Sequence, residues 1–333
     1  MLDKGNGVGF GPVSFCPFPN RAESQMTIQP SKRQAMREAR VAGVELGGTK
    51  IIGVIGQGRT ICAREQWPTG EDPSAVLPIV ADWLKRQQAD LSIEALGIAS
   101  FGPICLDQTD PRYGQILSTP KPGWSGIDVI EQLSRDLHVP VAFDTDVAGA
   151  ALAEGRWGAA VGCAVYAYLT IGTGIGGGIV INGKPLHGAL HPEIGHIRVR
   201  RADRDNFAGL CPFHGDCLEG LASGPAIAAR AGRSAQDLPS DHPLWNSIAS
   251  DIAEAMQMLI LTISPQRIIV GGGVGQGQRH LLSLVRAETA AGLAGYIPDR
   301  TARDLNDVIV PPLLGGEVGA LGSIALASSI EAV

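Results

Sequence analysis

A glycine-containing pair of strands occurs twice in this chain, and this repetition constrains the fold more than any other sequence feature. Residues 47–58 and 172–183 align at an offset of 125, and three glycines and two apolar positions coincide. The coinciding glycines are Gly47 with Gly172, Gly53 with Gly178, and Gly58 with Gly183. Three matches could also arise by chance in a chain that contains 44 glycines. A unit of two strands and a turn that is used twice nevertheless suggests two similar lobes, with both turns facing one cleft.

Strands and helices alternate around these two units. Apolar runs predict strands at 41–46, 51–56, 60–67, 95–100, 139–146, 163–172, 176–183 and 267–273. Helical periodicity predicts helices at about 73–88, 127–137, 218–232, 244–263 and 318–328. This alternation predicts an α/β fold class.

Length, charge and hydropathy narrow the function classes. A chain of 333 residues is long enough for about two domains. Its net charge of −6 argues against a nucleic-acid partner or an anionic membrane surface. No run of about 18 apolar residues suits a membrane-spanning helix. Residues 1–39 are rich in Gly and Pro in their first half, without a signal-peptide core, so we expect a disordered tail, and Met26 or Met36 could equally be the true start.

Four side chains that commonly bind metal lie within 22 residues, with the spacing H-x14-C-x2-H-x2-C. They are His196, Cys211, His214 and Cys217. Two thiolates and two imidazoles suit one tetrahedral zinc ion, and such a closed set leaves no position for a metal-bound water. We therefore expect a structural zinc ion that holds the neighbouring carboxylates Glu193 and Glu219 in place. A disulfide between the two cysteines is the alternative, but the other cysteines are scattered, which favours a reducing cytoplasm.

The glycine turns are candidate phosphate-binding loops. Glycine lets backbone N–H groups approach a polyphosphate closely, and Thr49 and Thr173 add hydroxyl donors. Taken singly, each turn is more often an ordinary hairpin. A G-x-G-x-x-G-like register starts at Gly172, but it lies between two strands and opens no helix, which disfavours a Rossmann dinucleotide site. A third cluster, residues 271–273, ends a buried strand and could leave room for a base or ribose.

Two acids mark the place where a predicted strand ends and a helix begins. Asp144 and Asp146 stand two residues apart, so they share one face if both are extended. Asp146 could simply be the N-cap of the helix, because Asp is a favoured cap. A carboxylate at the mouth of a cleft also suits a general base that takes a hydroxyl proton during attack on a phosphoryl group.

Several of these motifs together resemble the ROK family of sugar kinases and repressors. The motifs are ELGGTK, DTDVAGAALAEG, LTIGTGIGGG, HPEIGH and the C-x2-H-x2-C-x-E segment, and in this order they span nearly all of 41–333. ASFGP, TPKPGW and CPFHGDCLEGLASGPA are similar to the bacterial fructokinase branch of the family. The resemblance implies a two-lobed ATPase fold of the actin and hexokinase type, usually homodimeric, that transfers the γ-phosphoryl group of ATP to a hexose with Mg²⁺. It implies a smaller lobe of 40–145 plus 318–333 and a larger lobe of 146–317.

The resemblance also implies roles for single residues. Asp146 matches the catalytic base. Residues that match sugar-binding positions are Thr145, Glu193, His196 and Glu219, and His196 would also bind zinc. Residues that match the ATP site are Gly47, Gly48, Thr49, Lys50, Gly172, Thr173, Gly174, Gly271, Gly272 and Gly273. Lys50 is the weakest of these, because a solvated strand residue is its more ordinary role.

The chain departs from the common family pattern at a few positions. Glu45 replaces an Asp, and Thr145 replaces the Asn that precedes the catalytic Asp; the fructokinase branch tolerates both changes. Ala148 stands where an Asn is common, which removes a possible hydrogen bond worth about 1 kcal/mol.

The leading interpretation is an ATP-dependent fructokinase that produces fructose 6-phosphate. A kinase for mannose, glucose or another hexose is the main alternative, because hydroxyl-binding carboxylates recur across these enzymes. A sugar-responsive repressor is a third interpretation, but the 40 residues before Val41 are too short and too rich in Gly and Pro to form a helix-turn-helix module. A sugar-binding protein without catalysis is disfavoured because Asp146 and both glycine turns are present.

Overall fold

The structure is a computed structural model that describes residues 39–201, 205–298, 301 and 304–330, and these residues belong to one compact unit. The tail predicted for residues 1–39 lies outside the described residues, apart from Ala39.

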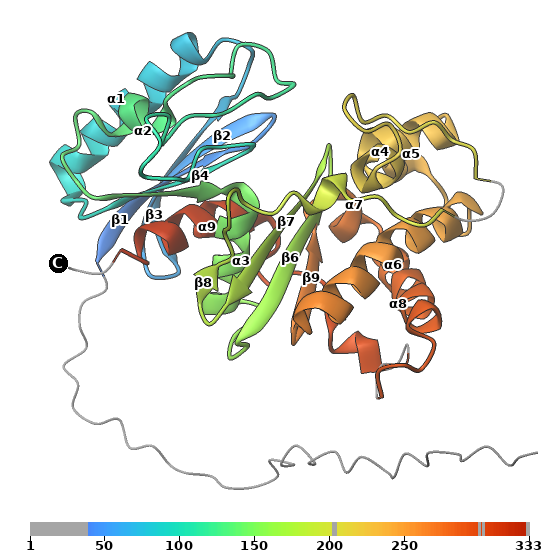
Figure 1. Ribbon diagram of the computed structural model, residues 1–333. Coiled ribbons are helices and arrows are strands. Elements are labelled where there is room, and N and C mark those ends of the chain that lie inside the picture. Colours follow the sequence, from blue (N-terminus) through green and yellow to red (C-terminus); the bar gives the residue numbers. More distant parts are fainter. Residues whose placement is uncertain (1–38, 202–204, 299–300, 302–303, 331–333) are drawn as a thin grey trace, which may run out of the picture. The chain divides into compact units, whose positions relative to one another are not determined.

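Two five-stranded sheets form the framework (Figure 1). The first has the order β3-β2-β1-β4-β5 and consists of β1 (Arg40–Leu46), β2 (Lys50–Gln57), β3 (Thr60–Pro68), β4 (Leu96–Ser100) and β5 (Val141–Thr145). The second has the order β10-β9-β6-β7-β8 and consists of β6 (Val165–Ile171), β7 (Ile175–Ile181), β8 (Lys184–Pro185), β9 (Arg267–Gly271) and β10 (Ile309–Val310).

The two sheets have the same topology. In each, the first three strands pair antiparallel in chain order, and the last two lie parallel to the first on its other side. The turns at residues 47–49 and 172–174 thus connect equivalent strands. This confirms the α/β class and the repeated unit that the glycine pattern predicted.

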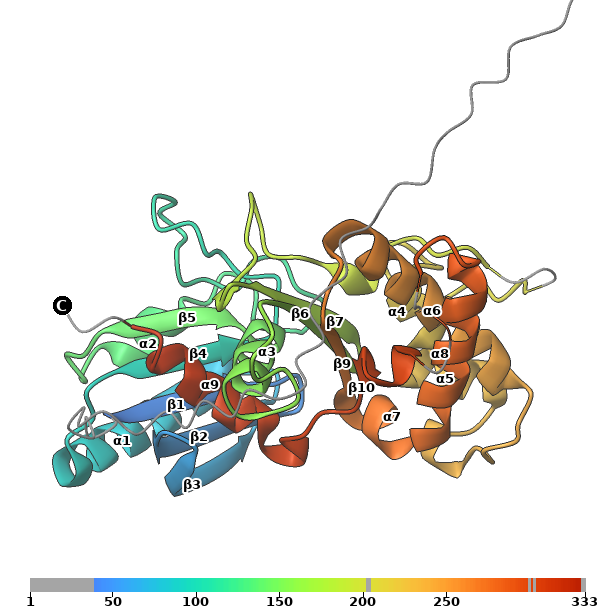
Figure 2. The same cartoon turned by 90° about the horizontal axis from the view of Figure 1, so that it is seen from below.

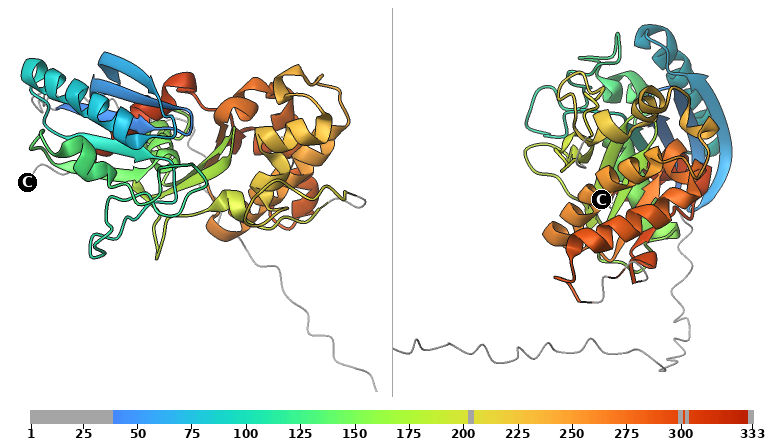
Figure 3. Two further views of the ribbon diagram at one scale, coloured as in Figure 1. Left: turned by 90° about the horizontal axis from the view of Figure 1, so that it is seen from above. Right: turned by 90° about the vertical axis from the view of Figure 1, so that its right-hand side faces the viewer.

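Some helices cover the outer faces of the two sheets, and others lie between the sheets. They are α1 (Pro73–Leu91), α2 (Val129–Ser134), α3 (Asp146–Trp157), α4 (Leu218–Ala222), α5 (Gly224–Ala231), α6 (Leu244–Ile263), α7 (Gly272–Gly277), α8 (Arg279–Leu293) and α9 (Val318–Ala327). Helices α1 and α2 pack on one face of the first sheet, whereas α4 to α8 gather beside the second sheet (Figure 3). Of the described helices, none combines the length and apolar character that crossing a bilayer requires.

Helices α3 and α9 lie between the sheets and connect them (Figure 2). Both are buried along most of their length, and their residues share one hydrophobic core with strands of both sheets. They approach closely where two glycines meet: a Cβ at Gly322 would lie 2.7 Å from the carbonyl carbon of Gly149. Because Asp146 is the first residue of α3, this contact positions the end of the helix that carries it.

Two of the predicted helices need correction. The helix expected at 218–232 is divided at Ser223, whose extended backbone ends α4 and whose hydroxyl accepts a hydrogen bond from Ala226 N at the start of α5. The helix expected at 127–137 is shorter, because α2 covers only Val129–Ser134. Helix α8 was not predicted, although Leu281, Val285 and Thr289 are buried at four-residue spacing.

Candidate active site

The candidate phosphate loops lie at the carboxyl ends of parallel strands. In the first sheet, Leu46 pairs with Ser100, and Ser100 pairs with Thr145, so the turn at 47–49 lies at the same edge as Asp146. In the second sheet, Thr170 pairs with Gly271, which brings residues 172–174 to the glycines at 271–273. A Cβ at Gly172 would lie 3.7 Å from Gly273 N. This edge of a parallel sheet is where α/β proteins generally bind ligands.

Thr145, and not Asp146, caps helix α3. The Thr145 hydroxyl accepts a hydrogen bond from Ala148 N at 3.1 Å, so the carboxylate of Asp146 is not needed as a cap. Asp146 Oδ1 instead accepts from the backbone N–H of Val147 at 2.9 Å. Asp144 is occupied elsewhere, because it accepts from Thr145 N and lies 3.1 Å from Nε2 of His187.

The protonation of Asp146 suits a base that works near neutral pH. Burial raises its pKa to about 7, and the negative charges of Glu45 and Glu193 add to this rise. The hydrogen bond from Val147 N opposes the rise by stabilising the charged form. A general base is most effective when its pKa lies near the working pH. Asp146 is also partly exposed to solvent. It is therefore suited to proton transfer and accessible to a substrate.

Two further carboxylates surround Asp146. Burial raises the pKa of Glu45, and the positive charges of Lys50 and Arg64 oppose this rise. Glu45 packs against the start of α9, where a Cβ at Gly319 would lie 2.1 Å from its Cδ. Burial raises the pKa of Glu193 to about 7, and the charge of Glu219 adds to that rise. Glu193 is thus close enough to influence Asp146 electrostatically, and Glu219 is close enough to influence Glu193.

His191 contacts Glu193. The ring of His191 is buried, and its Nε2 accepts a hydrogen bond from Ile104 N at 3.1 Å. Burial lowers the pKa of His191, so the ring is neutral near pH 7 and carries its proton on Nδ1. That Nδ1 lies 3.4 Å from Oε1 of Glu193. His191 thus lies between Glu193 and the segment that follows β4.

Glu219 contacts the second glycine loop. Its Oε2 accepts a hydrogen bond from Ile175 N at 2.9 Å, and a Cβ at Gly174 would lie 2.6 Å from the same oxygen. A side chain at 174 would therefore have to displace the Glu219 carboxylate. The next helix is tied to the same loop, since Gly224 N donates to Gly172 O at 2.7 Å.

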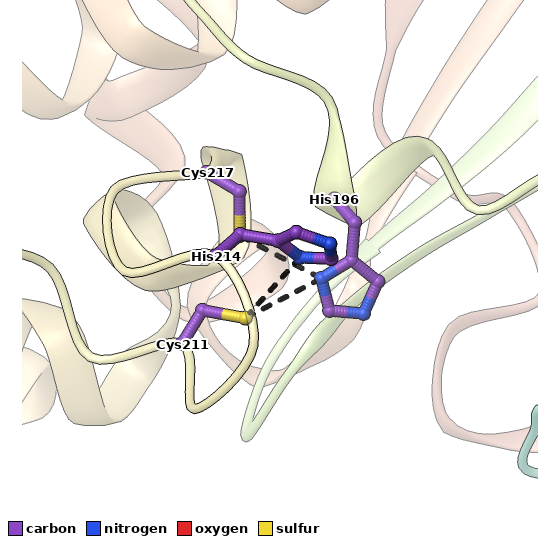
Figure 4. A group of neighbouring side chains, drawn as sticks. All are labelled: His196, Cys211, His214 and Cys217. Carbon is purple, nitrogen blue, oxygen red and sulfur yellow. Dashed lines mark hydrogen bonds between the residues drawn. The ribbon is translucent and has the colours of Figure 1, made fainter. Parts of the chain in front are cut away.

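The four predicted metal ligands converge (Figure 4). Their ligand atoms all lie within 4.8 Å of one another. Cys211 Sγ lies 3.6 Å from Nδ1 of both His196 and His214, and Cys217 Sγ lies 3.6 Å from Nδ1 of His196. Tetrahedral zinc bonded to sulfur at about 2.3 Å and nitrogen at about 2.05 Å requires S–N separations of about 3.55 Å. The cluster therefore fits a zinc ion.

His196 and the other three ligands come from separate segments. His196 ends a short 3₁₀ turn, Ile194–His196, and its second ring nitrogen points away from the sulfur atoms (Figure 4). The loop of Cys211 closes on itself through two hydrogen bonds with Gly215, which has a φ of 64°. Leu218 N then donates to Ile197 O, which joins the loop to the turn. Because Glu219 follows two residues after Cys217, the metal ligands and the Glu219 carboxylate are positioned together.

Ion pairs account for the arginine-rich stretch beside the metal cluster. Arg198 pairs with Asp216, and Arg201 lies between Asp216 and Asp205. Arg230 is almost fully buried and binds Asp205 at 2.8 Å and Asp251 at 2.9 Å. These contacts brace the metal loop and pair Arg198, Arg201 and Arg230 with carboxylates. Arg204, which belongs to the same stretch, lies outside the described residues.

The first glycine loop is exposed and is held from below by backbone contacts. Gly47 N donates to Lys50 O, and the Thr69 hydroxyl donates to Gly47 O at 2.7 Å. The side chain of Lys50, a candidate ATP ligand, is exposed at the first position of β2. Lys121 was not singled out from the sequence, yet its Nζ donates to Gly48 O at 2.8 Å. A lysine between two prolines was the available signal.

Comparison with known proteins assigns the family. A sequence model described as the ROK family matches residues 41–330. The chain is 43% identical over 295 residues to a fructokinase of Zymomonas mobilis, covering 86% of this chain and 96% of that protein. It is 38% identical over 290 residues to a fructokinase of Pediococcus pentosaceus, covering 87% and 98%. A solved ROK hexokinase from Thermus thermophilus matches with a TM-score of 0.67 and 26% identity, covering 86% of this chain and 97% of that one, which confirms the two-lobed actin and hexokinase type of fold. The chain belongs to the ROK family.

Proposed function

We propose that this protein is a fructokinase that transfers the γ-phosphoryl group of ATP to fructose, with fructose 6-phosphate and ADP as products. The observation that carries the proposal is the carboxylate of Asp146, whose pKa is raised to about 7 at the edge where the first glycine loop lies. Fructokinases that are 38% and 43% identical over most of the chain support fructose as the substrate.

In the proposed reaction, Asp146 accepts the proton of the attacking sugar hydroxyl. The hydroxyl oxygen forms a bond to the γ-phosphorus, and the bond from that phosphorus to the oxygen bridging to the β-phosphate breaks. ADP leaves with the electron pair of the broken bond. Backbone N–H groups of Gly48, Thr49, Thr173 and Gly174 would bind the phosphates, since Gly47 N and Gly172 N donate to carbonyls within their own turns. The glycines at 271–273 would leave space for the adenosine.

The sugar would be held by groups that accept or donate hydrogen bonds to its hydroxyls. Glu193 and Glu219 are carboxylates whose charges influence each other, and Thr145 supplies a hydroxyl next to Asp146. The second ring nitrogen of His196 is directed away from the thiols and is available for a hydroxyl. Holding one face of the sugar with several groups fixes the hydroxyl that faces the phosphate.

Two metal ions belong to the proposal. Zinc would be held by His196, Cys211, His214 and Cys217, and would stabilise the loop that carries Glu219. Magnesium would accompany ATP and neutralise phosphate charge, and the carboxylate oxygens of Glu45 are hard donors near Asp146 that suit it.

The remaining features rest on the sequence and on the family resemblance. We propose lobes of 40–145 plus 318–333 and of 146–317, a homodimeric assembly and a cytoplasmic location. The free thiols of Cys211 and Cys217, which zinc binding requires, favour a reducing compartment.

A hexose panel with coupled detection of ADP tests the proposal. The purified protein with Mg-ATP should release ADP much faster with fructose than with glucose or mannose. Faster turnover of glucose or mannose would instead indicate a kinase for another hexose. Absence of ADP release with every hexose, while sugar binding persists, would indicate a non-catalytic regulator.

A further inference from the structure

Lys121 reaches the first glycine loop from a distant part of the chain. It lies in the segment 119–126, between β4 and β5, and its Nζ donates a hydrogen bond to Gly48 O at 2.8 Å. An ammonium group has three N–H donors. Among the described residues, Gly48 O is the acceptor for one N–H of Lys121. The other two N–H groups are left for a ligand at this loop.

The backbone around Lys121 is fixed relative to that loop. Pro120 and Pro122 restrict φ on both sides of the lysine. The fully buried Trp124 donates from Nε1 to Gly70 O at 3.1 Å. Gly123, with a φ of 79°, lies against Glu71, because a Cβ at Gly123 would come within 2.0 Å of Glu71 O. The segment therefore packs tightly on residues 70–71.

The same stretch is tied to the glycine loop on its other side. Thr69 N donates to Thr49 O at 3.1 Å, and the Thr69 hydroxyl donates to Gly47 O at 2.7 Å. Residues 69–71 thus connect the Lys121 segment to the loop through short contacts. The backbone position of Lys121 is therefore set by the fold, and from that position its ammonium group reaches Gly48 O.

The charges of the site make this lysine distinctive. Glu45, Asp146 and Glu193 place negative charge where a triphosphate carrying about four negative charges would bind. The charge of Lys50 acts on Glu45, and Arg64 pairs with Glu317 at 2.8 Å. No carboxylate of the described chain forms an ion pair with Lys121. Its positive charge is therefore not neutralised by a neighbouring acid.

We propose that Lys121 is a further catalytic residue, which binds the γ-phosphoryl group of ATP while that group is transferred. The inference rests on the proposed kinase function and deepens it. Gly48 O holds the ammonium at the loop, and the other two N–H groups donate to γ-phosphoryl oxygens. A lysine is suited to this role because it acts as a compact positive charge on a phosphate. ADP lacks the γ-phosphoryl group and would not make this contact.

Two neutral variants test the proposal. Lys121→Met removes both the charge and the hydrogen bond, whereas Lys121→Gln removes the charge but keeps an N–H donor. Lys184→Met is the matched control, because Lys184 is exposed in β8 and belongs to no part of the site. Each protein is assayed for kcat with saturating Mg-ATP and fructose. Affinities for ADP and for the non-hydrolysable analogue AMPPNP are measured by calorimetry, and unfolding midpoints by differential scanning fluorimetry.

Both Lys121 variants should lose about 100-fold or more in kcat, as is typical when one donor to a developing charge is removed. AMPPNP should bind at least about fivefold more weakly, while ADP affinity and the unfolding midpoint stay near the wild-type values. A kcat within threefold of wild type would overturn the proposal. Equal weakening of ADP and AMPPNP binding, or a wild-type kcat in Lys121→Gln, would also overturn it. Either result would mean that Lys121 only connects its segment to the glycine loop.

Failure of the proposed function would be recognised separately. A wild-type protein that does not phosphorylate fructose refutes the substrate assignment. The difference between AMPPNP and ADP affinity in Lys121→Gln still tests the lysine in that case, because it needs no sugar.

Discussion

The turns at 47–50 and 172–175 join equivalent strands of two sheets with the same order, yet opposite charges contact them. The ammonium of Lys121 donates to a carbonyl of the first turn. The carboxylate of Glu219 accepts from a backbone N–H of the second turn. The repeated unit thus supplies two similar scaffolds, and side chains from elsewhere give each a different role.

Segments inserted at different points of the two halves cause this difference. The Lys121 segment lies between β4 and β5, whereas the metal loop with Glu219 lies between β8 and β9. Because these positions are not equivalent in the repeat, the two turns acquired different neighbours. We interpret the first turn as serving phosphoryl transfer and the second as linking the nucleotide to the sugar through Glu219.

The largest effect should come from Asp146, which lies beside the first turn and in the proposed reaction takes the proton of the sugar hydroxyl that attacks the phosphate. Asp146→Asn removes the base but keeps the size of the side chain, so kcat should fall about 10²- to 10⁴-fold. ATP affinity should be retained, since the glycine loops are intact. Steady-state kinetics and calorimetric titration with AMPPNP measure the two quantities. A variant with near-normal kcat would exclude Asp146 as the base.

Disrupting the metal loop should weaken fructose binding, because Glu219 contacts the second turn and is positioned by this loop. Cys211→Ser removes one of four ligands, so zinc content should fall and the KM for fructose should rise about 10- to 100-fold as Glu219 is released. The KM for ATP should change less. Metal analysis by mass spectrometry together with kinetics tests this. Unchanged fructose affinity in zinc-free protein would separate the metal loop from the sugar site.

The pH dependence should report the carboxyl group beside the first turn. The pKa of Asp146 is raised to about 7, so protonation below that value removes the base, and kcat/KM should fall about tenfold per pH unit below pH 7. The folded pKa lies above the unfolded value, so the charged carboxylate costs stability that appears as pH rises from about 4 through 7. Asp146→Asn should therefore unfold at a higher temperature than wild type at pH 8, and the difference should vanish near pH 4. A flat activity profile, or equal unfolding temperatures at pH 8, would contradict the raised pKa.

Matched glycine substitutions in the two turns should have the smallest effects and should distinguish the turns. Gly174→Ala places a Cβ 2.6 Å from Oε2 of Glu219, so the KM for fructose should rise, by about three- to tenfold. A Cβ at Gly48 meets no atom within 4 Å, so Gly48→Ala should leave the unfolding midpoint unchanged and act mainly on ATP. Kinetics with each substrate varied in turn would measure both. If both variants changed the KM of the same substrate, the two turns would not have the different roles that we assign to them.

The sequence predicted the scaffold better than the contacts within the site. The glycine register indicated two equivalent turns because the same strand geometry demands the same small residues, and the spacing of His196 and the Cys211 loop indicated a shared metal site. Long-range pairings carry no such periodic signal. The contact of Lys121 with Gly48 spans 73 positions and that of His191 with Ile104 spans 87, so both depend on how separate segments pack. Likewise, only the structure resolved that Thr145 caps α3 and leaves Asp146 available.

A crystal structure with AMPPNP and fructose bound tests the central claim most directly. The account predicts a fructose hydroxyl within hydrogen-bonding distance of the Asp146 carboxylate, about 2.6–3.2 Å, and directed at the γ-phosphorus. Glu193 and Glu219 should contact other hydroxyls of the same sugar. A complex in which Asp146 faces away from both ligands, or in which Glu219 lies apart from the sugar, would contradict it.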